Sequence, residues 1–214
     1  MDNILIATSG TREEHFEKIR IILQKPKDND LFLKPEKCQF AQQSVEYLGM
    51  IIGTEGVKMD SVKVQGLIDW PITTTVTEVR SFLSFGNFYK PFIADCAQIA
   101  QPLHDLTKKN VPFIWSTNQQ NAFDELKNQF ASQPVLQPVN YESPFTLQTD
   151  TSAFAIGATL SQTQEDRMEH PVAFFSCSLQ PAEINYDIFH QELLAIVKAL
   201  RHWHHHLLGA RHPI

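Results

Sequence analysis

The stretch at residues 145–162 constrains the fold most, because apolar and polar side chains alternate like a strand, break at Asp150 and resume as a second strand-like run. Side chains of a strand point to opposite faces in turn, so this alternation is typical of strands with one buried face. A helix is predicted from about 182 to 208, closed by Gly209, since glycine commonly ends helices. Three strands of an unfinished sheet are predicted before it, at residues 145–149, 155–163 and about 170–177.

The first part of the chain is predicted to contain strands and one helix. Strands are expected at residues 3–8 and 31–40 and in the stretch VEYLGMIIGTEGVKM, where GTEG indicates a hairpin turn. The stretch REEHFEKIRIILQK has helical spacing of its apolar residues. Pro26 is expected to end that helix, because proline disfavours the helical conformation of the residue before it.

From Asp60 the apolar residues change to helical spacing. Four helix-like stretches follow, separated by prolines, and Ser116 or Thr117 is expected to cap the last of them. Residues 134–144 contain three prolines and no clear period, so we place a boundary between units there.

Composition limits the class of protein. The 214 residues are 43% hydrophobic, which suffices for one medium domain or two small ones. No apolar run approaches the roughly 18 residues of a membrane span, and the N-terminus lacks the pattern of a secretory signal. We therefore expect an intracellular protein without a membrane partner. The net charge of −6 argues against binding nucleic acid by bulk electrostatics alone.

Two carboxylates in the last third are candidate metal ligands. Glu192 falls within an apolar helical stripe and is expected to point toward the strands, where an unpaired carboxylate would be costly. Asp150 is its expected neighbour, and Mg²⁺ commonly bridges two such carboxylates. From spacing alone, a plainer alternative is favoured, in which Glu192 reaches water from the stripe's edge and Asp150 starts a turn. The stripe consists of Phe189, Leu193, Ile196, Leu200, Trp203 and Leu207.

Several separately spaced motifs resemble one protein family. The stretches FTLQTDTSAFAIGATLSQ, HPVAFFSCSLQPAEINYD and HQELLAIVKALRHWHHHLLGARHPI resemble the start of the ribonuclease H domain of gypsy-type LTR retrotransposon polyproteins. Upstream, MDNILIATSGTREEH resembles the Y-x-D-D hairpin of the polymerase, and LFLKPEKCQFAQQSVEYLGMIIGTEGVKMD resembles the end of the palm with its primer-grip hairpin. VRSFLSFGNFYKPFI through QQNAFDELKNQFASQPVL resembles the thumb. The resemblance covers essentially the whole chain.

The resemblance implies an α+β fold, with palm-end hairpins and a helical thumb followed by a partial RNase H-like sheet of three strands and one long helix. The implied domains are the C-terminal part of the palm, the thumb, a linker and an incomplete RNase H-like domain, at residues 1–59, 60–133, 134–144 and 145–214.

The resemblance also assigns site residues. Asp150 and Glu192 are implied as catalytic carboxylates and metal ligands, and Asp2 matches the first aspartate of Y-x-D-D, with Asn3 in place of the second. Mg²⁺ or Mn²⁺ is expected for the parent enzyme and weakly or not at all for this chain. The implied partner is an RNA/DNA hybrid or a primer–template duplex. Contacts to it are expected from Leu48, Gly49, Lys58, Lys63, Arg80 and Lys90.

By its resemblance the parent protein synthesises DNA on an RNA template and hydrolyses the RNA of RNA/DNA hybrids. This chain is expected to be inactive in isolation, because it carries two of the family's four RNase H acids and lacks most of the polymerase. Two alternatives stay open: a catalytically dead module that binds nucleic acid, and an unselected structural remnant.

Overall fold

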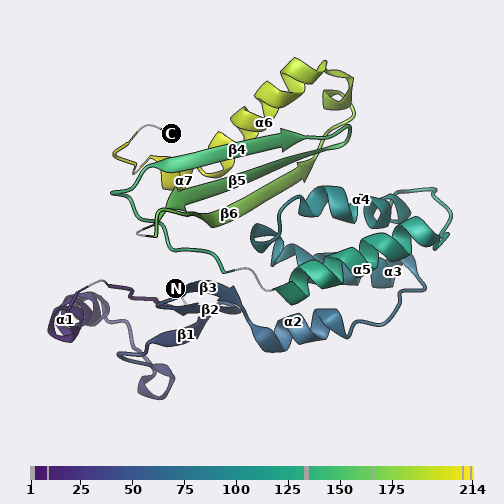
Figure 1. The fold of residues 1–214 in the computed structure, drawn as a ribbon. Helices are drawn as coiled ribbons and strands as arrows, with labels where there is room; N and C mark the ends of the chain where they lie inside the picture. Colours follow the sequence, from purple (N-terminus) through teal and green to yellow (C-terminus); the bar gives the residue numbers. More distant parts are fainter. Residues whose placement is uncertain (1–2, 9, 133–134, 165, 209, 213) are drawn as a thin grey trace. The chain divides into compact units, whose positions relative to one another are not determined.

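A computed structural model describes residues 3–8, 10–132, 135–164, 166–208, 210–212 and 214 (Figure 1). The chain divides into two compact units, Met1–Thr54 and Glu55–Ile214, and each is described by itself. Helices and antiparallel strands both occur, so the expected α+β class is confirmed. Among the described residues, no helix has the length and apolar character needed to cross a membrane.

The first unit begins with helix α1 (Arg12–Asp28). Thr11 caps it by accepting from the Glu14 N–H, while the Glu14 carboxylate accepts from the Thr11 N–H. The predicted end of this helix at Pro26 is wrong, because Pro26 lies inside it. Proline removes one N–H donor, but its carbonyl still accepts, here from the N–H of Asn29, so the helix continues for two more residues.

A tight hairpin completes the described part of this unit. Strands β1 (Ser44–Tyr47) and β2 (Met50–Gly53) pair in antiparallel register. Leu48 and Gly49 form the turn with φ values of 50° and 77°, and positive φ at both positions is what a two-residue hairpin loop of this kind requires. The strands predicted at residues 3–8 and 31–40 are wrong. The second stretch instead contains the 3₁₀ turn η1 (Pro35–Lys37), since proline supplies no N–H to a strand ladder.

The predicted GTEG turn is confirmed, because β2 ends at Gly53 and β3 (Gly56–Met59) follows. The second unit begins within this turn, at Glu55. Ser116 caps the last helix of the next group through its hydroxyl, which accepts from the Asn118 N–H. Phe82 and Phe123 pack in the core of these helices with ring centroids 4.6 Å apart. The helices are α2 (Ser61–Ile68), α3 (Val76–Asn87), the 3₁₀ turn η2 (Lys90–Phe92), α4 (Cys96–Leu106) and α5 (Thr117–Ser132).

The three strands predicted for the last third are confirmed. They are β4 (Phe145–Thr151), β5 (Ala155–Thr163) and β6 (Glu169–Ser178), which form an antiparallel sheet in the order β4-β5-β6. The register places Asp150 opposite Gly157, and Gly157 opposite Ser176 on the next strand.

Helices cover both faces of this sheet (Figure 1). On one face, α6 (Ile188–His202) packs through Ala199 and Trp203 against Phe145 and Leu160. The other face meets α4. The single helix predicted from 182 to 208 is divided into η3 (Glu183–Asn185), α6 and α7 (His204–Leu207), while Gly209 lies outside the described residues.

The described part of the stretch 135–144 is anchored at two points. Leu136 is buried and pairs with Val57. Gln162, which is 0% exposed, donates from its side chain to the carbonyls of Asn140 and Ser143 and accepts from the Asn140 N–H. This part of the chain is therefore held against the sheet by paired buried polar groups. The domain boundaries themselves stay predictions.

Candidate functional site

Asp150 lies near the end of β4 and is exposed. Because directly paired residues of antiparallel strands point to the same face, Asp150 shares its face with Gly157 and Ser176. Leu160 and Ala158 point to the opposite face, where they belong to the core under α6. Strand pairing therefore directs Asp150 away from the face that α6 covers.

The N-terminus of α4 meets the Asp150 face of the sheet. The backbone N–H of Ala97 donates to the buried Ser176 hydroxyl at 2.9 Å. The residue two positions earlier, Asp95, has a left-handed backbone conformation with φ 51° and places its carboxylate against Gly157. Burial raises the pKa of Asp95, and the nearby charge of Asp150 raises it further. A second carboxylate is thus the neighbour of Asp150.

Asp95 was missed by reasoning from the sequence. It stands just before a helical stretch, where an aspartate usually indicates an N-cap. Its side chain makes no capping hydrogen bond here. The sequence offered no indication that this residue would reach a strand more than 50 positions later.

Glu192 does not have the environment that its position in the apolar stripe predicted. Its side chain is exposed, and α6 packs on the sheet through a different side that carries Gln191, Ala195 and Ala199. The expectation that the helix turns Glu192 toward the strands is therefore wrong. Small residues allow close approach of the helix to the sheet, so they form the contact instead of the larger apolar ones.

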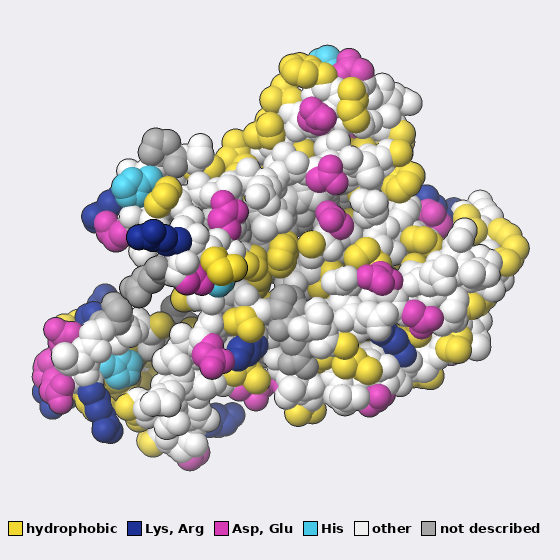
Figure 2. All heavy atoms as spheres, viewed as in Figure 1, with side chains coloured by type: hydrophobic (Ala, Val, Ile, Leu, Met, Phe, Trp, Pro, Cys, Tyr) yellow, Lys and Arg dark blue, Asp and Glu magenta, His cyan; other side chains and the backbone are white. Residues whose placement is uncertain are grey.

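Most of the predicted apolar stripe is on the outer side of α6. Figure 2 shows hydrophobic side chains along this helix. Phe189 is 68% exposed and Leu193 49%, whereas Trp203, which was assigned to the same stripe, is buried at 2%. Ile196 and Leu200 are exposed as well.

The residues present do not assemble a complete metal site. Within the described part of the chain, no group of three or more His, Cys, Asp or Glu side chains could hold a metal ion. Asp2, the candidate polymerase ligand, lies outside the described residues. Mg²⁺ prefers several oxygen ligands in near-octahedral geometry, so the described residues do not fit this ion by themselves.

The predicted nucleic-acid contacts are distributed over several elements. Leu48 is 56% exposed in the β1–β2 turn, which it forms with Gly49. Lys58 on β3 pairs with Glu55, and Lys63 on α2 lies 3.8 Å from Asp60. These lysines are partly exposed, and such surface ion pairs exchange readily with other anions because they contribute little free energy.

Arg80 and Lys90 complete the predicted set. The guanidinium of Arg80 on α3 donates to the carbonyl of Thr107 at 2.9 Å. Lys90 begins η2 and is half-buried. Both side chains line one cavity of the second unit.

Two family models match the chain. Residues 1–52 match "Reverse transcriptase (RNA-dependent DNA polymerase)", and residues 115–214 match "RNase H-like domain found in reverse transcriptase".

Relatives that match over the whole length of this chain identify the kind of protein more specifically. The Tf2-7 and Tf2-8 transposon polyproteins of Schizosaccharomyces pombe (strain 972 / ATCC 24843) are each 34% identical to this chain over 213 residues, which is 100% of the chain and 16% of the relative. The chain carries reverse transcriptase and RNase H-like regions of a retrotransposon polyprotein. It spans about a sixth of the length of these polyproteins.

Solved reverse transcriptases share the fold of this retrotransposon region. The foamy viral protease-reverse transcriptase in complex with RNA/DNA hybrid matches with a TM-score of 0.74 and 19% identity, over 92% of this chain and 27% of that one. The same type of protein in complex with dsDNA matches with a TM-score of 0.76 and 19% identity, over 97% and 43%. The predicted relationship to reverse transcriptases is confirmed by the two family models and the polyproteins. At 19% identity the solved structures show that the fold is shared.

Proposed function

We propose that this retrotransposon region binds duplex nucleic acid, either an RNA/DNA hybrid or a primer–template, as the thumb and RNase H-like part of a reverse transcriptase. The observation that supports this most is the fold shared over 92% of the chain with a reverse transcriptase whose structure holds an RNA/DNA hybrid. For the longer polyprotein we propose RNA-directed DNA synthesis and hydrolysis of the RNA strand.

Contacts to the phosphate backbone are assigned to lysines that are already weakly paired. Lys58 and Lys63 are partly exposed and have carboxylate partners that a phosphate can replace. The turn of Leu48 and Gly49 is proposed to contact the primer strand. The net charge of −6 favours recognition by duplex shape and a few such contacts over a broad basic surface.

Binding without hydrolysis is proposed for this chain. Asp150 has the carboxylate of Asp95 beside it, and Glu192 is exposed. Asp150 and Glu192 are proposed as metal ligands only in the longer protein, where further ligands would be needed. An RNA/DNA hybrid incubated with this chain and Mg²⁺ or Mn²⁺ is expected to stay intact. Cleavage that Asp150→Asn abolishes would contradict this part of the proposal.

The binding experiment measures fluorescence anisotropy of a labelled RNA/DNA hybrid, duplex DNA and single-stranded DNA in EDTA over a range of salt concentrations. Duplexes are expected to bind more tightly than the single strand, with affinity falling steeply as salt rises. Lys63→Gln should reduce the slope of log affinity against log salt by about 0.9, the value for one lost phosphate contact.

Lys109→Gln is the matched control, because Lys109 is exposed and is not a predicted contact. It is expected to leave the salt slope unchanged. Equal, weak binding of all three nucleic acids and of heparin would contradict the proposal and favour the alternative of an unselected remnant.

A further inference from the structure

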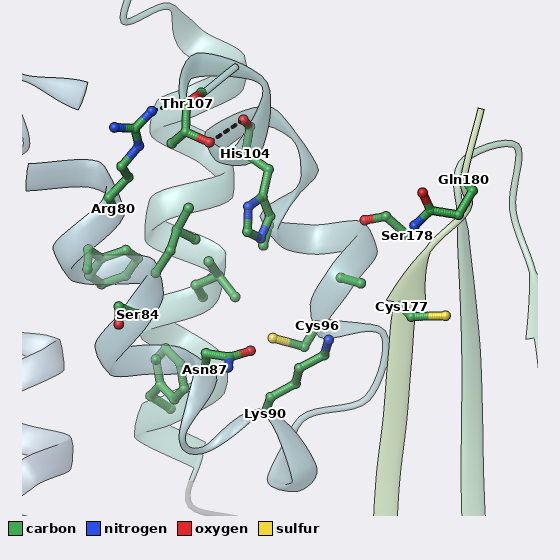
Figure 3. A pocket seen from close by; sticks show the side chains of 17 residues that line it. Arg80, Ser84, Asn87, Lys90, Cys96, His104, Thr107, Cys177, Ser178 and Gln180 are labelled. Atoms are coloured by element: carbon green, nitrogen blue, oxygen red, sulfur yellow. Dashed lines mark hydrogen bonds between the residues drawn. The ribbon is translucent and has the colours of Figure 1, made fainter. Parts of the chain in front are cut away.

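The second unit contains a cavity of about 580 Å³ (Figure 3). It lies between α3, η2 and α4 on one side and the end of β6 on the other, with one wall contributed by α5. Ligand sites for small organic molecules commonly have volumes of about 300–1,000 Å³. The cavity is therefore large enough for a molecule of nucleotide size.

Basic side chains from three elements line the cavity. They are Arg80 on α3, Lys90 on η2 and His104 on α4, and no Asp or Glu is among the described residues that line it. Burial and the charge of Lys90 lower the pKa of His104, so its ring is neutral at neutral pH. Figure 3 shows the Lys90 side chain and the His104 ring directed into the cavity, while Arg80 is at its rim. The hydrogen bond to the Thr107 carbonyl holds the Arg80 guanidinium there.

No acidic side chain among the described residues of the lining neutralises the charges of Lys90 and Arg80. Lys90 forms no ion pair with any residue in the described ranges of the chain. The two thiols of the lining cannot do so either: burial raises the pKa of Cys96 to about 11 and also raises the pKa of Cys177, so both stay protonated at neutral pH. The charge of Lys90 partly opposes the shift of Cys96, and Figure 3 shows the Lys90 side chain beside Cys96.

The remaining lining combines an apolar wall with hydrogen-bonding groups. Leu83 supplies accessible apolar surface, whereas Phe82, Leu126 and Phe130 are at most 2% exposed. Asn87 and Ser178 are among the polar groups. An inorganic phosphate would leave most of this volume unfilled. A molecule with an anionic group at one end, and at the other a flat apolar ring system that carries hydrogen-bonding atoms, would match both parts of the lining.

We propose that this cavity binds a small organic phosphate of nucleotide size, with the phosphate at the Lys90 ammonium and the organic part against Leu83 and Asn87 of α3. The Lys90 ammonium has no competing carboxylate among the described lining residues, so a phosphate gains a charge-assisted hydrogen bond there without displacing an ion pair. The proposal does not depend on duplex binding by the chain.

The test titrates the full 214-residue chain with 5′-AMP by isothermal calorimetry, with adenosine as the ligand that lacks the anion. AMP is expected to bind with a dissociation constant below about 1 mM, and adenosine at least about tenfold more weakly, because a charge-assisted hydrogen bond contributes about 1.5–3 kcal/mol. Lys90→Met should raise the dissociation constant for AMP at least about tenfold. Lys109→Met, at an exposed lysine outside the cavity lining, should have no effect.

A second variant keeps the proposal testable if Lys90→Met fails to fold. Ser84 lines the cavity and is exposed, so Ser84→Trp is expected to obstruct the cavity without entering the core. It should abolish AMP binding while duplex binding persists, which separates this proposal from the proposed function. Absence of saturable AMP binding to the wild type, or unchanged binding to a folded Ser84→Trp variant, would overturn it.

A competition experiment distinguishes two sources of the phosphate, a free nucleotide and the end of a nucleic-acid strand. A hybrid with a single-stranded 5′ overhang is compared with and without its terminal phosphate. If AMP competes with the phosphorylated end, the cavity accepts a strand terminus. If AMP binds and the end does not compete, the ligand is a free nucleotide. Both outcomes support the site, and failure of AMP to bind excludes it.

Discussion

The carboxylate of Asp95 occupies the space beside Gly157 that a Cβ atom would otherwise fill. Gly157 is the strand partner of Asp150, so the absence of a side chain at this position lets α4 bring a second carboxylate toward the exposed end of β4. The charge of Asp150 contributes to the raised pKa of Asp95. The junction between α4 and the sheet therefore contains two acids, and the charged form of Asp95 is disfavoured there.

Replacing Asp95 by asparagine is expected to stabilise the protein at neutral pH. Asparagine tolerates the left-handed conformation of this position and removes the like-charge contact. Because the pKa of Asp95 is raised in the folded state, the unfolded chain releases the proton first as pH rises, and stability falls through that interval. Asp95→Asn should raise the melting temperature by about 1–2 °C at pH 7, as expected for an exposed to half-exposed charge pair.

The pH dependence gives the control for this variant. Below the ordinary aspartate pKa of 3.8 the carboxyl is protonated in both states, so the difference between wild type and Asp95→Asn should vanish. Thermal unfolding followed by circular dichroism at pH 3 and pH 7 measures the difference in melting temperature between the two proteins. A stabilisation of equal size at both pH values would show that the charge is not its cause.

Two glycines in helices are expected to respond oppositely to the same substitution. Gly66 is exposed in α2, and an added Cβ would meet nothing within 4 Å. Gly66→Ala should therefore stabilise by about 0.5–1 kcal/mol through helix propensity. Gly86 in α3 is buried, and its added Cβ would lie 2.9 Å from Phe130, which is 1% exposed and cannot move away easily. Gly86→Ala should destabilise by about 1–3 kcal/mol.

Urea unfolding at 25 °C measures both variants under identical conditions. The slopes with urea are expected to match the wild type, because neither change alters the surface exposed on unfolding. A stabilising Gly86→Ala would mean that α3 and α5 are less closely packed than the structure indicates.

The strands of the last third could be predicted because their alternation is local. Residues 145–148 show apolar and polar side chains in turn, and the structure has a strand there. The stretch 31–40 has apolar residues too, but Pro35 interrupts it and Phe32 is 95% exposed. A partner strand decides whether such a run becomes a strand, and partners are not visible in a local pattern.

The approach of Asp95 to the sheet could not be predicted, because it depends on packing between elements that are distant in sequence. The hydrogen bond from Ala97 to Ser176, which fixes α4 on the sheet, joins residues 79 positions apart. The orientation of α6 was mispredicted for a related reason. Periodicity selected its large apolar residues, whereas Ala195 and Ala199, both 0% exposed, form the contact because they permit the closest approach.

The orientation of α6 gives a third prediction. Leu193 is 49% exposed on the outer side of α6. Leu193→Ala should therefore lower the free energy of unfolding by less than about 1 kcal/mol. The matched substitution is Leu160→Ala, at a leucine of β5 that is 0% exposed, and it should cost about 2–5 kcal/mol. Free energies of unfolding from urea titrations measure both. Equal, large losses of stability in both variants would mean that the stripe faces the sheet, as the sequence predicted.

Gln162 provides the last prediction, because it connects the stretch before β4 to the sheet. Its side chain bonds the N–H and carbonyl of Asn140 and the carbonyl of Ser143 while it is 0% exposed. Gln162→Leu leaves these backbone groups without their partner in a buried setting, so a loss of about 2–3 kcal/mol is expected. Gln148→Leu, at an exposed glutamine of β4, is the matched control and should change stability by less than about 0.5 kcal/mol.

Amide hydrogen exchange identifies where the loss from Gln162→Leu occurs. The Asn140 N–H donates to the Gln162 side-chain oxygen at 2.9 Å, so its protection should fall in Gln162→Leu and stay unchanged in Gln148→Leu. Gln162→Glu keeps the acceptor for this N–H but places a carboxylate at a fully buried position. Its stability should therefore be lowest at neutral pH and recover as pH falls and the carboxyl is protonated. A Gln162→Glu variant as stable as the wild type at pH 7 would mean that water reaches this position.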